Sequence, residues 1–197
     1  MVVLGLTGGI ASGKSTAVRW FLEHGIPVVD ADQVVRELQQ PGGLLLLAIQ
    51  EAFGPGFILA DGTLDRKALG QLIFNDPAAK KKLDGISHPL VEARLQEEVA
   101  RWRQQDAALL VLDVPLLFEA GLEKMTDLTA VVHVPFEVQL SRLMKRDGID
   151  EDYARSKIAS QASLDEKRAK ADFVLDNGGD PLALTRQLTE LYGQLIQ

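Results

Sequence analysis

The sequence predicts an α/β fold built on a doubly wound sheet of five parallel strands. A strand, a glycine-rich turn, a helix and a second strand follow one another within the first 30 residues. This order is typical of a βαβ unit, whose strands are parallel. Two later runs, 108–114 and 128–134, are almost continuously apolar, as strands buried on both faces of a parallel sheet are.

The predicted strands alternate with helices along the chain. We expect strands at 2–6, 26–30, 108–114, 128–134 and 173–175. Apolar residues at helical spacing, with glycine or proline at the ends, predict helices at 14–24, 31–39, 44–53, 65–74, 88–104, 135–146 and 182–195. Pro89 is expected in the first turn of its helix, where a proline costs no hydrogen bond. The highly charged segment 147–170 receives no assigned element.

Composition excludes several classes of function. The chain has 197 residues, no cysteine and a formal net charge of −7. Without cysteine there is no disulfide, thiolate nucleophile or cysteine-bound metal. The negative charge opposes binding to a nucleic-acid backbone, whereas a small phosphorylated ligand needs only a local cluster of donors. The first residues lack the basic start of a secretory signal, and the apolar run 44–49 is too short to span a bilayer, so we expect a cytoplasmic protein.

The residues after the first strand match the phosphate-binding pattern G-x-x-x-x-G-K-[ST] at every fixed position. Glycines let the backbone curl until successive N–H groups point at phosphates, and the next helix directs its positive N-terminus at the same anion. Lys14 can reach the β- and γ-phosphates, and Ser15 can bind the magnesium that bridges them. The pattern therefore predicts a P-loop NTPase fold that binds ATP with Mg²⁺. The expected nucleotide contacts here are Gly8, Gly9, Ala11, Ser12, Gly13, Lys14, Ser15 and Thr16.

Acidic residues close two further predicted strands. Of Asp30 and Asp32, one can cap the next helix while the other accepts the proton of an acceptor hydroxyl, and we assign Asp32 to the active site. Asp113 ends a strand where P-loop proteins place a carboxylate that holds magnesium directly or through water. A plain turn residue before Pro115 is the alternative. Glu119 is a weaker candidate for a substrate or metal contact.

The segment 139–170 is rich in cations for an acidic protein. Arg142 and Arg146 lie four residues apart and share a helix face. Arginines on a closing lid can neutralise a transferring phosphoryl group and exclude water. Because acidic residues are interleaved, we expect each single cation other than Arg142 on a solvated face. The cations are Arg142, Lys145, Arg146, Arg155, Lys157, Lys167, Arg168 and Lys170.

Over nearly its whole length the chain resembles the dephospho-CoA kinases. The matching stretches are 6–16, 29–32 (Val-Asp-Ala-Asp), 61–66, 88–89, 113–119 (Asp-Val-Pro-Leu-Leu-Phe-Glu) and 171–177. A large superfamily shares the phosphate loop, whereas 29–32, 113–119 and 171–177 are much more specific together. The resemblance implies transfer of the ATP γ-phosphate to the ribose 3′-hydroxyl of dephospho-CoA, the last step of coenzyme A synthesis.

The same resemblance implies roles for single residues. Asp32 would act as the base on the 3′-hydroxyl, with Lys14 and Arg142 as further catalytic residues. Asn177 and Gly178 would flank the adenine, while substrate contacts would come from Arg66, His88 and Glu119. Lys157 stands at a lid position where arginine is expected; lysine keeps the charge but loses the bidentate geometry, so we assign it no catalytic role.

The resemblance also implies one P-loop kinase domain over 1–197 with three parts. These are a core (about 1–33, 105–135 and 171–197), a helical insert on the CoA side (about 34–104) and a helical lid (about 136–170). The residues alone leave two other functions open: another small-molecule P-loop kinase, for a nucleoside, nucleotide or shikimate-like alcohol, and a nucleotide-binding switch. GTPase switches usually carry Asn-Lys-x-Asp, which this sequence lacks. We expect a small-molecule substrate, no nucleic acid or membrane partner, and a monomer or weak homo-oligomer.

Overall fold

The computed structural model of the chain describes residues 1–180 and 182–196. The chain divides into two compact units. The first comprises Met1–Val29 and Val99–Gln197, and the second comprises Asp30–Glu98. Each unit has its own architecture.

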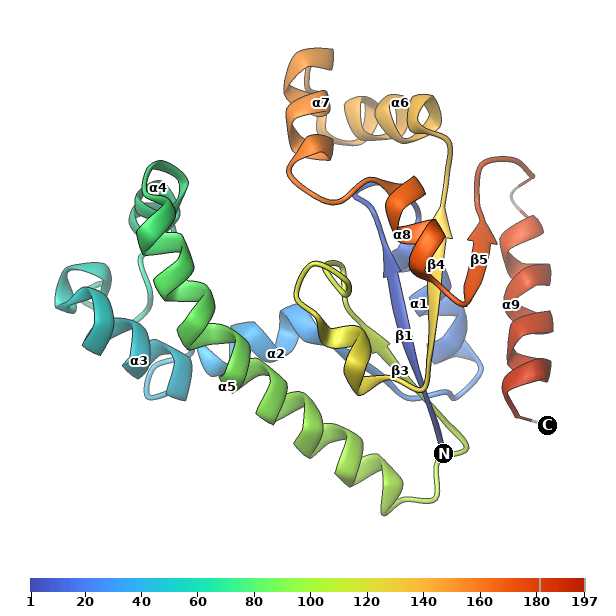
Figure 1. Ribbon diagram of the computed structural model, residues 1–197, viewed down its shortest axis with the longest axis horizontal. Coiled ribbons are helices and arrows are strands. Elements are labelled where there is room, and N and C mark those ends of the chain that lie inside the picture. The colour runs from blue at the N-terminus through green and yellow to red at the C-terminus, as the bar shows by residue number, and fades with distance from the viewer. Residues whose placement is uncertain (181, 197) are drawn as a thin grey trace. The chain divides into compact units, whose positions relative to one another are not determined.

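A five-stranded parallel sheet in the order β2-β3-β1-β4-β5 forms the centre of the first unit (Figure 1). Val2 of β1 pairs with Leu109 of β3, and Leu4 of β1 pairs with Leu128 of β4, so β1 is the central strand. The predicted class is confirmed, and each strand lies within two residues of its predicted ends. The strands are β1 (Val2–Gly8), β2 (Val28–Asp30), β3 (Leu109–Asp113), β4 (Leu128–His133) and β5 (Phe173–Asp176).

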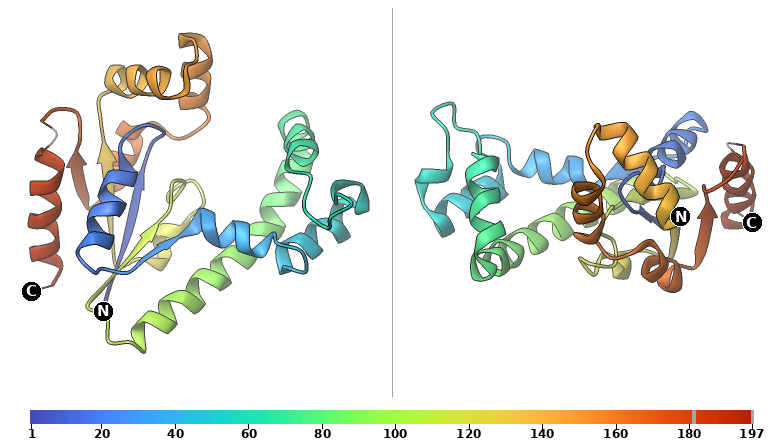
Figure 2. Two further views of the ribbon diagram at one scale, coloured as in Figure 1. Left: turned by 180° about the vertical axis from the view of Figure 1, so that it is seen from behind. Right: turned by 90° about the horizontal axis from the view of Figure 1, so that it is seen from above.

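Helices cover both faces of this sheet, as the two views of Figure 2 show. On one face, α1 (Lys14–Glu23) and α9 (Ala183–Leu195) pack against Ala130 and Val132 of β4. Val131 lies between these two residues and therefore points to the opposite face. There it packs with Leu164 of α8 (Leu164–Lys170). The first and last helices thus share one layer, while α8 belongs to the other.

The charged segment that received no element forms two helices, α7 (Glu151–Ala159) and α8. Each begins at a side-chain cap: Asp150 accepts the N–H of Tyr153, and Ser163 forms a capping box with Glu166. Their interleaved charges conceal the short apolar stripe that packs α7 against α6 (Phe136–Asp147). A short 3₁₀ helix, η2 (Leu122–Met125), precedes β4.

The second unit is helical. It contains α2 (Ala31–Leu38), α3 (Leu44–Phe53), the 3₁₀ helix η1 (Pro55–Phe57), α4 (Arg66–Asn75) and most of α5 (Pro77–Arg103). No helix within the described residues combines the length and apolar character needed to cross a bilayer.

The predicted start of α5 was wrong. The helix begins at Pro77, and Asp76 caps it by accepting the N–H groups of Ala78 and Ala79. Pro89 therefore lies inside the helix. Proline there removes one helical hydrogen bond, and burial of residues such as Leu95 offsets that cost. The first-turn rule for proline was sound, but it applies to Pro77.

Candidate active site

The phosphate loop joins β1 to α1 at the carboxyl edge of the sheet. Its backbone enters the left-handed region at Ala11 (φ 58°) and Gly13 (φ 92°). Backbone of this kind turns successive N–H groups toward one side and forms an anion-binding concavity. A side chain at Gly13 would be strained by that φ, and its Cβ would overlap Nδ2 of Asn177. Glycine is therefore required at this position for two independent reasons.

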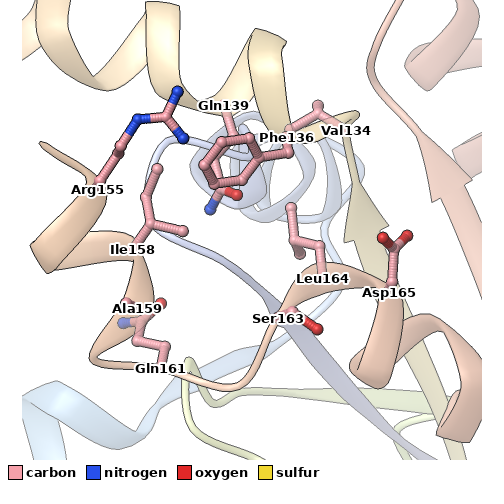
Figure 3. A pocket seen from close by; sticks show the side chains of 10 residues that line it. All are labelled: Val134, Phe136, Gln139, Arg155, Ile158, Ala159, Gln161, Ser163, Leu164 and Asp165. Atoms are coloured by element: carbon pink, nitrogen blue, oxygen red, sulfur yellow. The ribbon is translucent and has the colours of Figure 1, made fainter. Parts of the chain in front are cut away.

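Two glutamines bind the loop at Ile10. Nε2 of Gln139, on α6, donates to the carbonyl of Ile10 at 2.8 Å, and Oε1 of Gln161 accepts the Ile10 N–H at 3.2 Å. Both glutamines also line a mainly apolar cavity of about 300 Å³ bounded by α6, α7 and the start of α8 (Figure 3). Two side chains from the segment after β4 thus hold the two peptide groups on either side of Ile10 in the phosphate loop.

Lys14 and Asp113 meet where the loop and β3 end. Their side chains form an ion pair and are 17% and 10% exposed. Ser15 lies exposed beside Lys14 in the first turn of α1. Oxygen atoms of a carboxylate and a hydroxyl are ligands that Mg²⁺ prefers, usually together with phosphate oxygens. The residues present therefore fit a magnesium ion that is bound jointly by protein and nucleotide.

No dedicated metal cage accompanies this pair. Across residues 1–180 and 182–196, no three histidine, cysteine, aspartate or glutamate side chains are grouped to hold an ion.

Arg142 of α6 and the residues that follow β5 meet beside the loop. Nη2 of Arg142 donates to the carbonyl of Asn177 at 2.9 Å. Nδ2 of Asn177 in turn donates to the carbonyl of Ser12 at 2.8 Å. Gly178 follows, and its N–H donates to Oδ1 of Asp176 at 2.7 Å. The structure thus brings Arg142, Asn177 and Gly178 together at the edge of the phosphate loop.

Comparison with known proteins agrees with this geometry. A model of the dephospho-CoA kinase family matches residues 2–182. The chain belongs to the dephospho-CoA kinase family. It is 46% identical over 195 residues to the dephospho-CoA kinase of Anaeromyxobacter dehalogenans. The aligned region covers 99% of this chain and 92% of that relative. Its activity is accordingly that of a dephospho-CoA kinase, an ATP-using enzyme of the final step of coenzyme A biosynthesis.

Solved structures show the same relationship. A protein from Thermus thermophilus matches with a TM-score of 0.81 and 34% identity, covering 100% of this chain and 98% of that one. A dephospho-CoA kinase from Campylobacter jejuni matches with a TM-score of 0.75 and 28% identity, covering 98% and 96%. The resemblance inferred from the motifs is confirmed, and the kinase reading prevails over the nucleotide-binding switch.

Several cations of the predicted lid of this dephospho-CoA kinase are paired on the surface, as expected. Asp147, which ends α6, binds Nε of Arg146 at 2.7 Å and Nζ of Lys157 at 2.8 Å. The hydrogen bond from Arg146, followed by that from Lys157, lowers the pKa of Asp147 to about 2. The same carboxylate raises the pKa of the Arg146 guanidinium. Asp147 therefore joins α6 to α7.

Lys167 contradicts the expectation of a solvated face. Its side chain is 0% exposed, and its Nζ donates to three oxygens around the phosphate loop. These are the carbonyl of Pro115 at 2.7 Å, Oε1 of Glu119 at 2.9 Å and the carbonyl of Gly8 at 3.3 Å. Glu119 also accepts the N–H of Ala162 at 3.1 Å.

The sequence predicted Lys167 as an exposed cation, which is wrong, and it gave no indication that Gln139 and Gln161 contact the phosphate loop. For Lys167 a signal exists: Leu164, Lys167 and Ala171 recur at helical spacing and share one face of α8. A lysine between two apolar residues on a short helix indicates burial. The two glutamines carry no comparable signal, because their role depends on contacts with a loop more than 120 residues earlier.

Asp32, Arg66 and His88 belong to the second unit. Asp30 is the cap of α2: its Oδ1 accepts the N–H of Asp32 at 2.8 Å and that of Gln33 at 3.2 Å. The carboxylate of Asp32 is exposed and makes no hydrogen bond or ion pair with the described residues. The prediction that one of these two aspartates caps the helix is confirmed, and the cap is Asp30. Arg66 and His88 are both exposed, in α4 and α5.

Proposed function

We propose that this kinase transfers the γ-phosphate of ATP to the ribose 3′-hydroxyl of dephospho-CoA, giving coenzyme A and ADP. Family membership supports the reaction. The observation that carries the site is the phosphate loop, whose glycine-dependent backbone is joined to the Lys14–Asp113 pair. Loop, cation and carboxylate are the parts that P-loop phosphotransfer requires.

Binding of the triphosphate is assigned to the loop and to the start of α1. The N–H groups of residues 8–16 would surround the β- and γ-phosphates, and Lys14 would contact the same oxygens. Ser15 and Asp113 would hold Mg²⁺, which when bound neutralises charge on the phosphate oxygens. The ammonium of Lys14 contacts the carboxylate that we propose as a metal ligand. Asn177 and Gly178 would flank the adenine, and Arg142 would act as a catalytic lid arginine near the nucleotide.

Substrate binding and proton transfer are assigned to other residues. Asp32 would accept the proton of the 3′-hydroxyl. Its exposed carboxylate supports this role, since Asp30 performs the capping of α2. Arg66, His88 and Glu119 would contact dephospho-CoA. The compact helical unit Asp30–Glu98 supports a separate CoA-side part, and the segment 136–170 would act as the lid.

We further infer a cytoplasmic enzyme that acts on small molecules, as a monomer or weak homo-oligomer. A net charge of −7 opposes binding to nucleic acids or to anionic membrane surfaces.

The decisive experiment is product formation by the purified protein with ATP, magnesium and dephospho-CoA. Mass spectrometry would detect the added phosphate, and fragmentation would locate it on the ribose 3′-oxygen. AMP, adenosine and shikimate would serve as competing acceptors, and omission of magnesium as a control. Magnesium-dependent phosphorylation of dephospho-CoA alone is expected. Phosphate at another position, or faster transfer to another acceptor, would overturn the proposed regiochemistry or substrate.

A further inference from the structure

Lys167 is the one cation of α8 that lies entirely inside the protein. Its side chain is 0% exposed, whereas its neighbours Arg168 and Lys170 are exposed. Moving an ammonium out of water is strongly unfavourable unless its N–H donors find acceptors inside the protein. Here the three N–H donors face three acceptors: two backbone carbonyls and one carboxylate.

One of the three acceptors ends β1, and the other two lie in the segment that follows β3. Gly8 ends β1 and begins the phosphate loop. The hydrogen bond from Lys167 to its carbonyl therefore fixes the point where the loop leaves the sheet. Pro115 lies two residues after Asp113, and its carbonyl also accepts the hydroxyl of Thr7 at 3.1 Å. Lys167 therefore ties the start of the loop to the segment that follows β3.

The third acceptor adds a charge relationship. Glu119 is a carboxylate on the same segment after β3, and its side chain is 25% exposed. Without a cationic partner it would place an uncompensated negative charge beside the binding site of an anionic triphosphate. The negative charges of this carboxylate and of the triphosphate would repel each other more strongly in a partly buried site than in water. The ammonium of Lys167 neutralises the Glu119 carboxylate, just as the ammonium of Lys14 neutralises the carboxylate of Asp113.

We propose that Lys167 is a positioning residue for phosphoryl transfer, whose buried ammonium fixes the start of the phosphate loop and neutralises Glu119 so that the loop binds nucleotide phosphates. Lys167 touches no substrate in this scheme and acts through Gly8, Pro115 and Glu119. The inference rests on the proposed nucleotide site at the loop.

The test compares Lys167→Met with Arg168→Met, which removes the adjacent but exposed cation of the same helix. Calorimetry would measure binding of ADP in the presence of magnesium, and steady-state kinetics would give KM for ATP and kcat. Lys167→Met is expected to weaken ADP binding by about tenfold or more, because charge-assisted hydrogen bonds are lost. KM for ATP should rise by a similar factor, Lys167→Arg should restore most of the affinity, and Arg168→Met should match the wild type.

A purely structural role would give a different result. Partial unfolding lowers the active fraction and hence the apparent kcat, but it leaves KM and the dissociation constant of the folded molecules unchanged. Lys167→Met that is folded by circular dichroism, with an ADP affinity and KM within about twofold of wild type, would overturn the proposal. If Lys167→Met does not fold, Lys167→Gln, which keeps N–H donors but no charge, is judged by the same criterion.

Failure of this inference is distinguishable from failure of the proposed site. If the wild-type protein and Lys14→Ala bind ADP equally, the nucleotide site itself is misassigned. If Lys14→Ala weakens binding while folded Lys167→Met does not, the site stands and Lys167 is removed from it.

Discussion

The ammonium of Lys14 is paired with the carboxylate of Asp113, the last residue of β3. Neither side chain is more than 17% exposed, so each needs a partner of opposite charge. In the proposed site, the phosphates of ATP would supply new acceptors for Lys14, and Mg²⁺ would supply a new partner for Asp113. One contact therefore links the two residues whose proposed functions depend on each other.

Lys14→Ala is expected to abolish measurable turnover. The variant loses a phosphate contact that strengthens as charge develops in the transition state. Coenzyme A formation measured by mass spectrometry would check this result. Arg19→Ala is the matched control, because Arg19 is an exposed cation on the same helix. Substantial activity in Lys14→Ala would remove the phosphate loop from the mechanism.

Asp113→Asn keeps the shape of the side chain but loses its charge. If Asp113 supports the magnesium site, the Mg²⁺ concentration needed for half-maximal rate should rise by about 10- to 100-fold. A magnesium titration of the initial rate would measure this change. Asp106→Asn is the control, since Asp106 lies exposed just before β3 and its φ of 53° is one that asparagine tolerates. An unchanged magnesium requirement would show that Asp113 serves only as the partner of Lys14.

Asp32→Asn tests the proposed base. The rate of phosphate transfer should fall by about two to four orders of magnitude, because a general base is lost. ADP affinity should stay close to that of the wild type, since the second unit does not supply the phosphate loop. Asp30→Asn is the natural comparison, because asparagine caps a helix as well as aspartate does. Near-normal rates in Asp32→Asn would assign the proton transfer to another group.

Gly13→Ala should destroy nucleotide binding through geometry alone. The added methyl would overlap Nδ2 of Asn177, and the backbone would keep a φ of 92° that alanine disfavours. Gly25→Ala separates these two effects, because Gly25 has a similar φ of 70° but no atom within 4 Å of an added Cβ. ADP binding should be lost only in Gly13→Ala, while thermal unfolding should show a penalty in both variants. Equal ADP affinity in the two would contradict the role of the Gly13–Asn177 approach.

The ionised carboxylate of Asp147 should stabilise the fold at neutral pH and lose this effect only at low pH. Its pKa in the folded protein is about 2, below the ordinary value of 3.8, so its stabilising effect is present above 3.8 and is lost as the pH falls through about 2. Asp147→Asn should therefore be slightly less stable than the wild type by a constant amount above pH 5. The difference should shrink below about pH 4 and vanish below about pH 2. Denaturant unfolding at several pH values would test this, with Asp152→Asn as an exposed control. A difference that changes between pH 6 and 8 would contradict it.

Local patterns predicted the sheet and the phosphate loop well. The strands are apolar runs that pack on both faces, and the match from Gly8 to Ser15 encodes its own backbone geometry. The sequence also predicted that one of Asp30 and Asp32 caps the helix while the other stays free of that role, because a helix cap and an exposed carboxylate are both local properties. In each case the residues that decide the outcome lie within a few positions of one another.

Predictions failed where distant contacts decide the outcome. Lys167 was expected in solvent because its neighbours in sequence are charged, yet its environment is set by Gly8, Pro115 and Glu119. Pro89 was expected to start a helix, but packing of the surrounding turns continues α5 through it.

The phosphate loop is made early in protein synthesis, but the side chains that fix it are made late. Gln139, Gln161 and Lys167 come from the second half of the chain, and Asn177 binds a residue 165 positions before it. A nascent chain therefore carries an incomplete nucleotide site until Asn177 has left the ribosome. We expect that a chain truncated before Asn177 gains no stability from ATP and is degraded faster by the cell's proteases than the wild type.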